Sequence, residues 1–371
     1  MTAPATASTD LLYSEAEDDL RAAVRALLAD RCDAVTVLAR IESGQPHDSE
    51  LWKALAADMG LAGLLVPEDL GGQGASHREA AVVLEELGRA VAPVPYLTSA
   101  VVATEALLAC GGSGEVAELL GALASGRTVG ALALPLSLAP GAPYDVVREE
   151  GGRLHGTISG VADAAAADVL LVVADTGLYA VDTTQDGVTV DPLTALDLTR
   201  PLAAITLNGA RGRALTADAD TAVRRGLLAG AGLLASEQLG LADWCLTETV
   251  AHTRQRYQFN RPVGSFQALK HRLAELWLSV AGARAAARNA ADALATDSAE
   301  APLAVALAQS YCAPVAVHAA EEALQLHGGI GMTWEHPVHL YLKRAKSDSI
   351  ALGTAGRHRE ALAELVDLQA P

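Results

Sequence analysis

The strongest constraint on the fold is that the local sequence pattern changes twice along the chain. Up to about residue 127, apolar residues recur at helical spacing. From 128 to 219, short β-prone runs such as TVGALALP, VLLVVA and LAAITLNGA alternate with Gly, Asp and Pro. From 220 the chain is helical again and rich in Ala. We therefore expect an α+β, mainly α fold with an N-terminal helical domain (1–127), a small antiparallel β domain (128–219) and a C-terminal helical bundle (220–371).

Several residues predict where helices begin and end. Ser14 followed by Glu17 predicts a capping box at the start of the first helix. Gly60 predicts the end of a later helix, and the pair Gly328–Gly329 predicts the end of a long one. The Ala- and Leu-rich faces of 220–330 predict that this region associates with another copy or with a partner chain.

Composition narrows the class of protein. Of the 371 residues, 51% are hydrophobic but only 4% are aromatic, so the core must be built from Ala, Leu and Val. No uninterrupted apolar run approaches the ~18 residues of a membrane span, and the start carries no secretory signal pattern, so we expect a cytoplasmic protein. The net charge of -18 argues against non-specific binding to nucleic acid. Four widely spaced cysteines predict reduced thiols; they are Cys32, Cys110, Cys245 and Cys312.

A basic segment interrupts this acidic chain. Between Ala251 and Ala274 there is no Asp or Glu, and Tyr257 and Phe259 lie among the cations. The cations are Arg254, Arg256, Arg261, Lys270 and Arg272. An Arg offers a forked donor to phosphate and an aromatic ring offers a flat surface, so the segment suits a phosphorylated cofactor with a base. The alternative is a solvated helix end with cations near its C-terminus.

A second candidate is QLHGGIGMTWEHP, from Gln325 to Pro337. Its glycines let backbone approach a ligand closely, although they do not form GxGxxG and no strand precedes them. The alternative is a plain helix end followed by a turn. We expect no metal site at His327, His336 and His339, because Pro337 interrupts any shared helix face. There is no GxSxG, and Ser265 is expected to cap a helix.

Three stretches together resemble the acyl-CoA dehydrogenase family. They are MGLAGLLVPEDLGGQGAS with AVVLEELGRA (59–90), RYQFNRPVGSFQALKHRLAEL (256–276) and LQLHGGIGMTWEHPVHLYLKRAK (324–346). The resemblance covers nearly the whole chain. It implies a central β-barrel or sandwich, a C-terminal four-helix bundle, and oxidation of an acyl-CoA thioester at Cα–Cβ with FAD as hydride acceptor. An electron-transferring flavoprotein is implied as a further partner.

The resemblance also implies which residues bind the cofactor. In the family, the R–x–x–F…Q and Q–x–x–G–G motifs of one subunit hold the pyrophosphate and adenosine half of a neighbouring subunit's FAD. The matching positions here are Arg256, Phe259, Gln267, Gln325, Gly328 and Gly329.

Other family positions are altered. Leu352 stands where the family's usual catalytic Glu precedes Gly-Thr, and Gly230 stands at the alternative base position. Neither residue can take a proton. Ala133 and Leu134 replace the Thr and Glu of a flavin-contacting Leu-Thr-Glu-Pro, and Gly160–Val161–Ala162 replaces Trp-Ile-Thr.

Groups that would serve a neighbour's FAD are therefore kept, while those for the chain's own flavin ring and base are lost. The chain resembles the non-catalytic (β) subunit of actinobacterial α2β2 dehydrogenases acting on steroid side chains. One alternative is a self-sufficient homo-oligomeric dehydrogenase with a displaced base, Asp348 or Glu237. Another is a binding or structural protein of the same fold without a redox role.

Overall fold

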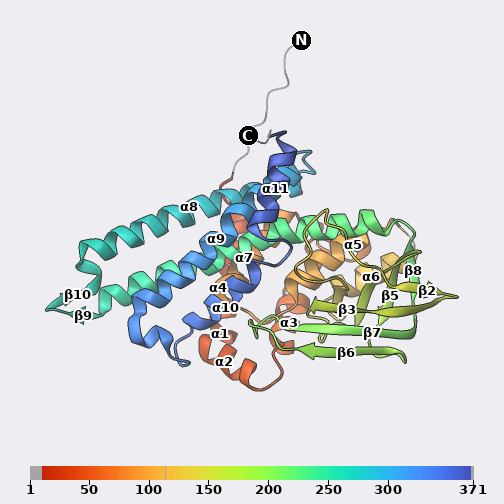
Figure 1. Cartoon of the computed structure of the whole chain (residues 1–371), viewed down its shortest axis with the longest axis horizontal. Coiled ribbons are helices and arrows are strands. Elements are labelled where there is room, and N and C mark those ends of the chain that lie inside the picture. The colour runs from red at the N-terminus through yellow and green to blue at the C-terminus, as the bar shows by residue number, and fades with distance from the viewer. Residues whose placement is uncertain (1–10, 113, 369–371) are drawn as a thin grey trace, which may run out of the picture.

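The computed structural model describes residues 11–112 and 114–368. A block of helices from both ends of the chain packs on one side, and a β domain packs on the other (Figure 1). The start of the chain, where no secretory signal is predicted, lies largely in residues 1–10, outside the described residues.

The N-terminal helices begin with the expected capping box. The Ser14 hydroxyl accepts from the Glu17 N–H at 3.2 Å, and the Glu17 carboxylate accepts from the Ser14 N–H at 2.6 Å, which confirms the prediction. Gly60 adopts φ 72° and closes the helical segment before it, as expected. The helices are α1 (Glu15–Arg31), α2 (Ala34–Glu42), α3 (Ser49–Lys53), α4 (His77–Ala90), α5 (Thr104–Leu108) and α6 (Gly114–Ala124), with π-helical turns η1 (Ala54–Asp58) and η4 (Tyr96–Ala103) and 3-10 turns η2 (Leu61–Gly63) and η3 (Glu68–Leu70).

Two four-stranded sheets form the central domain, in the orders β1-β4-β5-β8 and β2-β3-β7-β6. Their strands are β1 (Gly130–Leu132), β2 (Arg148–Glu150), β3 (Arg153–Ala162), β4 (Val169–Ala174), β5 (Gly177–Asp182), β6 (Val188–Leu193), β7 (Leu202–Arg211) and β8 (Arg213–Thr216). The expectation of an entirely antiparallel domain was wrong at one pairing, because β1 runs parallel to β4. The chain leaves the first sheet after β1, forms β2 and β3, and then re-enters, which allows the parallel direction.

The C-terminal region is a bundle in which α7 (Ala219–Gln255), α8 (Gln267–Ala295) and α9 (Ala301–His327) run side by side (Figure 1). Helices α10 (Val338–Asp348) and α11 (Ala355–Leu365) pack on α9. Helix α7 is connected to α8 by a short hairpin and a 3-10 turn. The hairpin strands are β9 (Tyr257–Gln258) and β10 (Arg261–Pro262), and the turn is η5 (Val263–Ser265). The 3-10 turn η6 (Gly328–Met332) follows α9, which ends at Gly328 as predicted.

The division at residues 127 and 219 falls between α6 and β1 and at the start of α7, and we propose it as the domain organisation.

Small residues allow the long helices to approach closely. Many of the fully buried side chains of α7, α8 and α9 are Ala, as the low aromatic content predicts. Within the described residues, one helical stretch, Ala301–Met332, is long and apolar enough to cross a membrane by length and composition alone. However, 61% of its most apolar window is buried inside the molecule, so much of this apolar surface is used in packing.

Candidate functional site

The end of α7 presents the first sequence-predicted cofactor residues. Arg256 is the residue that ends α7, with its N–H donating to the His252 carbonyl at 2.9 Å. In the hairpin that follows, Phe259 and Asn260 both have positive φ (53° and 60°), the pattern of a type I′ turn. A Phe in this left-handed region is unusual, and its ring is 85% exposed. The turn thus holds an aromatic ring outside the molecule.

The cations of this segment are exposed and available. Among the residues that the structure describes, no ion pair is formed by Arg254, Arg256, Arg261 or Lys270, whereas Arg272 pairs with Glu322 at 2.7 Å. Arg261 lies over the Phe266 ring at 3.7 Å, which leaves its guanidinium edge free to bind an anion. The alternative of cations placed only to stabilise a helix C-terminus does not account for Arg261 and Lys270, which lie beyond the end of α7.

The first turn of α8 adds backbone donors to the same place. The residue before the helix is Phe266, which supplies no side-chain cap, and the first turn contains no acid. The prediction that Ser265 caps this helix was wrong, because Ser265 lies in the preceding 3-10 turn and its hydroxyl is buried without a partner in the described structure. An uncapped helix N-terminus attracts an anion, and exposed Gln267 is its first residue.

The end of α9 supplies the other predicted residues. Gly328 has φ 63° and ψ -139°, a conformation that only glycine adopts readily. Gly328 and Gly329 are exposed, and a Cβ on either would meet no atom within 4 Å, so the backbone borders open space. Gln325 is exposed beside them.

A row of histidines joins these two helix ends. The His327 ring lies 4.3 Å from the His252 ring at the end of α7 and 4.5 Å from His336 in the loop after η6, measured between centroids. The rings therefore pack against one another, and no group of three or more metal-binding side chains occurs in the described part of the chain. His339 instead stacks on Trp334, with centroids 4.4 Å apart. Arg256 and Gly328 thus lie at one end of the bundle, each close to this row.

Gly230 and Leu352, the two positions at which the sequence resemblance implies a base, come together in space, and both are apolar here. A Cβ built on Gly230 would lie 3.1 Å from the Leu352 side chain and 2.6 Å from Val102. Leu352 has φ 53°, its N–H donates to the Leu136 carbonyl at 2.6 Å, and its side chain is buried. The spot where a catalytic carboxylate is expected is therefore filled with methyl groups.

The cavity at this spot is about 30 Å³, room for one or two water molecules. Leu134 and Ala162, which replace flavin-contacting residues of the family, line the same cavity. Its full lining is Leu97, Thr98, Val102, Leu132, Leu134, Pro135, Leu136, Ala162, Leu227 and Leu352. Small-molecule sites usually measure ~300–1,000 Å³, so neither a flavin ring nor an acyl chain fits.

A separate cleft of about 710 Å³ shares only Pro135 with this cavity. It lies between residues 138–148 and the first half of β3, and neither Leu352 nor Gly230 lines it. The base positions therefore do not open onto it.

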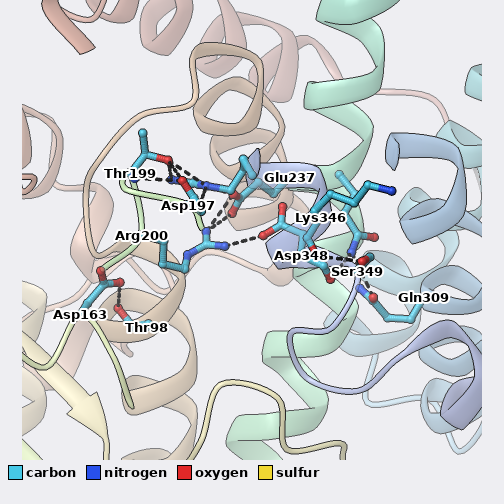
Figure 2. A network of polar contacts seen from close by, with 12 residues as sticks. Thr98, Asp163, Asp197, Thr199, Arg200, Glu237, Gln309, Lys346, Asp348 and Ser349 are labelled. Atoms are coloured by element: carbon cyan, nitrogen blue, oxygen red, sulfur yellow. Dashed lines mark hydrogen bonds and ion pairs between the residues drawn. The ribbon is translucent and has the colours of Figure 1, made fainter. Parts of the chain in front are cut away.

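The two displaced-base candidates lie elsewhere, in a buried ionic cluster (Figure 2). Arg200 contacts the Glu237 carboxylate at 2.6 Å and Asp348 Oδ1 at 2.6 Å. Burial alone would raise the pKa of Glu237, but Arg200 and Arg344 hold it below its ordinary value. Neither carboxylate lines the Leu352 cavity, so neither displaced-base candidate lies at this spot.

The arginines of this cluster were missed at the sequence level. Arg344 on α10 contacts Asp197 at 2.6 Å and Glu237 at 2.5 Å, and its Nη2 donates to the Thr199 hydroxyl at 2.6 Å. The available signal was LDLTRP, which places an acid and an arginine in the loop between two β-prone runs, but nothing in the sequence named their partners on α7 and α10.

Comparison with known proteins decides the family. The acyl-CoA dehydrogenase N-terminal domain profile matches residues 14–127, and the C-terminal domain profile matches residues 220–366. "Acyl-CoA dehydrogenase IpdE2" of Mycolicibacterium smegmatis is 36% identical over 92% of this chain and 95% of its own length. The chain belongs to the acyl-CoA dehydrogenase family.

Two solved structures are also similar. The "ChsE4-ChsE5 complex from Mycobacterium tuberculosis" contains a chain with a TM-score of 0.86 and 31% identity, covering 98% of this chain and 100% of that one. The "Tcur3481-Tcur3483 steroid ACAD G363A variant" gives a TM-score of 0.83 and 30% identity, covering 95% and 98%. This chain of the acyl-CoA dehydrogenase family therefore shares its fold with chains from two structures that are each named after two proteins.

Proposed function

We propose that this chain is the non-catalytic subunit of a mixed, α2β2 FAD-dependent acyl-CoA dehydrogenase, in which it completes the FAD site of the partner chain. The observation that carries the proposal is a contrast between two places. Leu352 and the altered positions Leu134 and Ala162 line an apolar cavity of only about 30 Å³, while the cofactor residues at the end of the bundle are exposed.

The residues at the bundle end fit a dinucleotide. Arg256 and the uncapped start of α8 would hold the pyrophosphate, because both offer N–H donors to an anion. Gln325, Gly328 and Gly329 would border the adenosine half, where the backbone faces open space. Phe259 and Gln267 would complete the contact from the hairpin and from α8. When bound, FAD accepts the hydride from the substrate.

The base that removes the substrate's α-proton would come from the partner, because Leu352 and Gly230 carry no titratable group. The substrate class we propose is a bulky acyl-CoA thioester, such as a steroid side chain, because relatives of this chain include a complex named as a steroid dehydrogenase. We further propose a cytoplasmic location and electron transfer to an electron-transferring flavoprotein.

A partner surface is available on the bundle. Exposed apolar side chains extend along α8, α9 and the turns at their ends, and exposed apolar surface of this extent marks an interaction site. They are Tyr257, Phe259, Trp277, Leu278, Leu307, Tyr311, Ile330, Met332 and Trp334. We propose that the partner dehydrogenase covers this face.

The visible spectrum tests the proposal. The chain should be purified alone and after co-expression with candidate partner chains of the acyl-CoA dehydrogenase family from the same genome. We expect flavin absorbance and acyl-CoA oxidation only in the co-expressed sample. Stoichiometric FAD and turnover in the chain alone would contradict the proposal and favour a self-sufficient enzyme. A colourless sample with every candidate partner would favour a non-redox role.

A further inference from the structure

The buried ionic cluster connects three parts of the fold. Asp197, Thr199 and Arg200 come from the β6–β7 loop, Glu237 from α7 and Asp348 from α10 (Figure 2). Arg344 also comes from α10. All six side chains are buried, and Asp348 is completely inaccessible to solvent. Because α10 ends at Asp348, the cluster also anchors the turn that carries Leu352 into the closed cavity.

The cluster contains more acids than bases. Arg200 and Arg344 form ion pairs with three carboxylates, those of Asp197, Glu237 and Asp348, and Asp163 is a further acid near Arg200. Both arginines contact Glu237, and Arg344 also binds Asp197. Asp348 contacts one of them, through Oδ1 only. An uncompensated buried charge is costly, so one carboxylate in excess calls for neutralisation.

Two buried side-chain oxygen atoms of this network have no donor in the described structure. They are Asp348 Oδ2 and Gln238 Oε1. Their residues are already linked, because Gln238 Nε2 donates to the main-chain oxygen of Asp348 at 3.2 Å. Gln238 Nε2 also donates to Gln309 Oε1, and Gln309 Nε2 donates to the Ala231 carbonyl, so the amide orientations are fixed by their partners. Asp348 Oδ2 therefore carries no donor that would favour its ionised form, and a carboxylic acid proton can occupy this oxygen.

We propose that Asp348 retains a proton on Oδ2 in the folded chain at neutral pH. This proton leaves Arg200 and Arg344 paired with the carboxylates of Asp197 and Glu237, and it accounts for an Asp348 Oδ2 to which no group donates.

The charged and polar groups around Asp348, taken from each element that packs against it, support this assignment. The loop contributes Arg200 and Asp197, α7 contributes Glu237, α10 contributes Arg344, and α9 contributes only the neutral amide of Gln309. Burial, together with Glu237 and Asp197 and against the two arginines, raises the pKa of Asp348 to about 8. Lys346 does not compensate Asp348, because its ammonium group pairs with Glu321 at an exposed site.

The proposal fixes the sign of a pH effect. In the unfolded chain an Asp titrates near ~3.9, so between that pH and about 8 the folded chain binds one proton more than the unfolded chain. The contribution of Asp348 to the free energy of unfolding therefore falls as pH rises between these two pKa values. It falls no further above the pKa of Asp348 in the folded chain.

Thermal unfolding of the full chain at pH 6 and pH 9 tests the proposal with two variants. Asp348→Asn keeps the shape and supplies an amide donor in place of the proton. We expect it to melt at or above the wild-type temperature at pH 9 and to show a smaller drop between pH 6 and pH 9. Asp197→Asn, the matched control, should melt below wild type at both pH values, because it removes a charge that Arg344 requires.

Infrared difference spectra between the same pH values give a direct readout. The wild type should lose a protonated-carboxyl C=O band at alkaline pH, and Asp348→Asn should lack that band. If Asp348→Asn melts as low as Asp197→Asn, fails to fold, or leaves the band unchanged, Asp348 is an ionised partner of Arg200 and the proposal is wrong. The test does not involve flavin, so its outcome is independent of the proposed function.

Discussion

At the scale of single residues, the account depends on Leu352. We propose that this residue stands at the position of the family's catalytic Glu. Leu352 has positive φ, its N–H donates to the Leu136 carbonyl, and its side chain lines a cavity with Val102 beside Gly230. A carboxylate introduced there would be buried, and no cation lines the cavity.

We therefore expect Leu352→Glu to lower the free energy of unfolding by about 3 kcal/mol or more and to create no dehydrogenase activity in the chain alone. Leu352→Met should cost less than about 1.5 kcal/mol because it conserves volume. Urea unfolding measures both changes. A stable, active Leu352→Glu chain would show that a complete active site is present and only the base is missing.

Substitutions at two adjacent glycines distinguish the effect of backbone strain on stability from the effect of cofactor contact on flavin binding. Gly328 needs its positive φ, whereas Gly329 has ordinary φ and borders open space. Gly329→Ala should leave the unfolding free energy within about 0.5 kcal/mol of wild type but weaken flavin retention in the mixed assembly. Gly328→Ala should cost about 1–3 kcal/mol. Full flavin retention by Gly329→Ala would remove that residue from the proposed contact.

At the scale of elements, local signals predicted helix ends well and long-range pairings poorly. Ser14, Gly60 and Gly328 mark ends through contacts made within a few residues, so their sequence context suffices. The parallel β1–β4 pairing and the arginine cluster join segments far apart in the chain, and no local pattern encodes such partners. Ser265 failed as a cap because the 3-10 turn shifts the helix start to Gln267.

The contact between α4 and α7 gives a test at this scale. A Cβ on Gly240 would lie 1.9 Å from the Glu85 carbonyl oxygen, so the two helices touch through backbone. Gly240→Ala should destabilise the chain by about 3 kcal/mol through forced separation of the helices. Gly356→Ala, on the exposed start of α11, should be neutral or stabilising by up to about 1 kcal/mol. Equal melting temperatures for the two variants would contradict the close packing.

At the scale of the whole molecule, the chain has two sites of different character, one exposed and cationic and the other buried and apolar. One end of the bundle exposes unpaired arginines and a glycine turn, and the junction with the β domain is closed by apolar side chains. The family resemblance of the sequence already indicated which residues were kept and which were lost. The structure adds that the kept residues lie at one end of the bundle and that the altered residues Leu134, Ala162 and Leu352 line one closed cavity.

The ratio of flavin to protein in the co-expressed assembly tests this central claim most directly. With equal numbers of both chains, we predict one flavin for every two chains, lost on Arg256→Ala in this chain and unchanged on Leu352→Met. One flavin per chain, or full flavin retention by the Arg256→Ala assembly, would contradict the account.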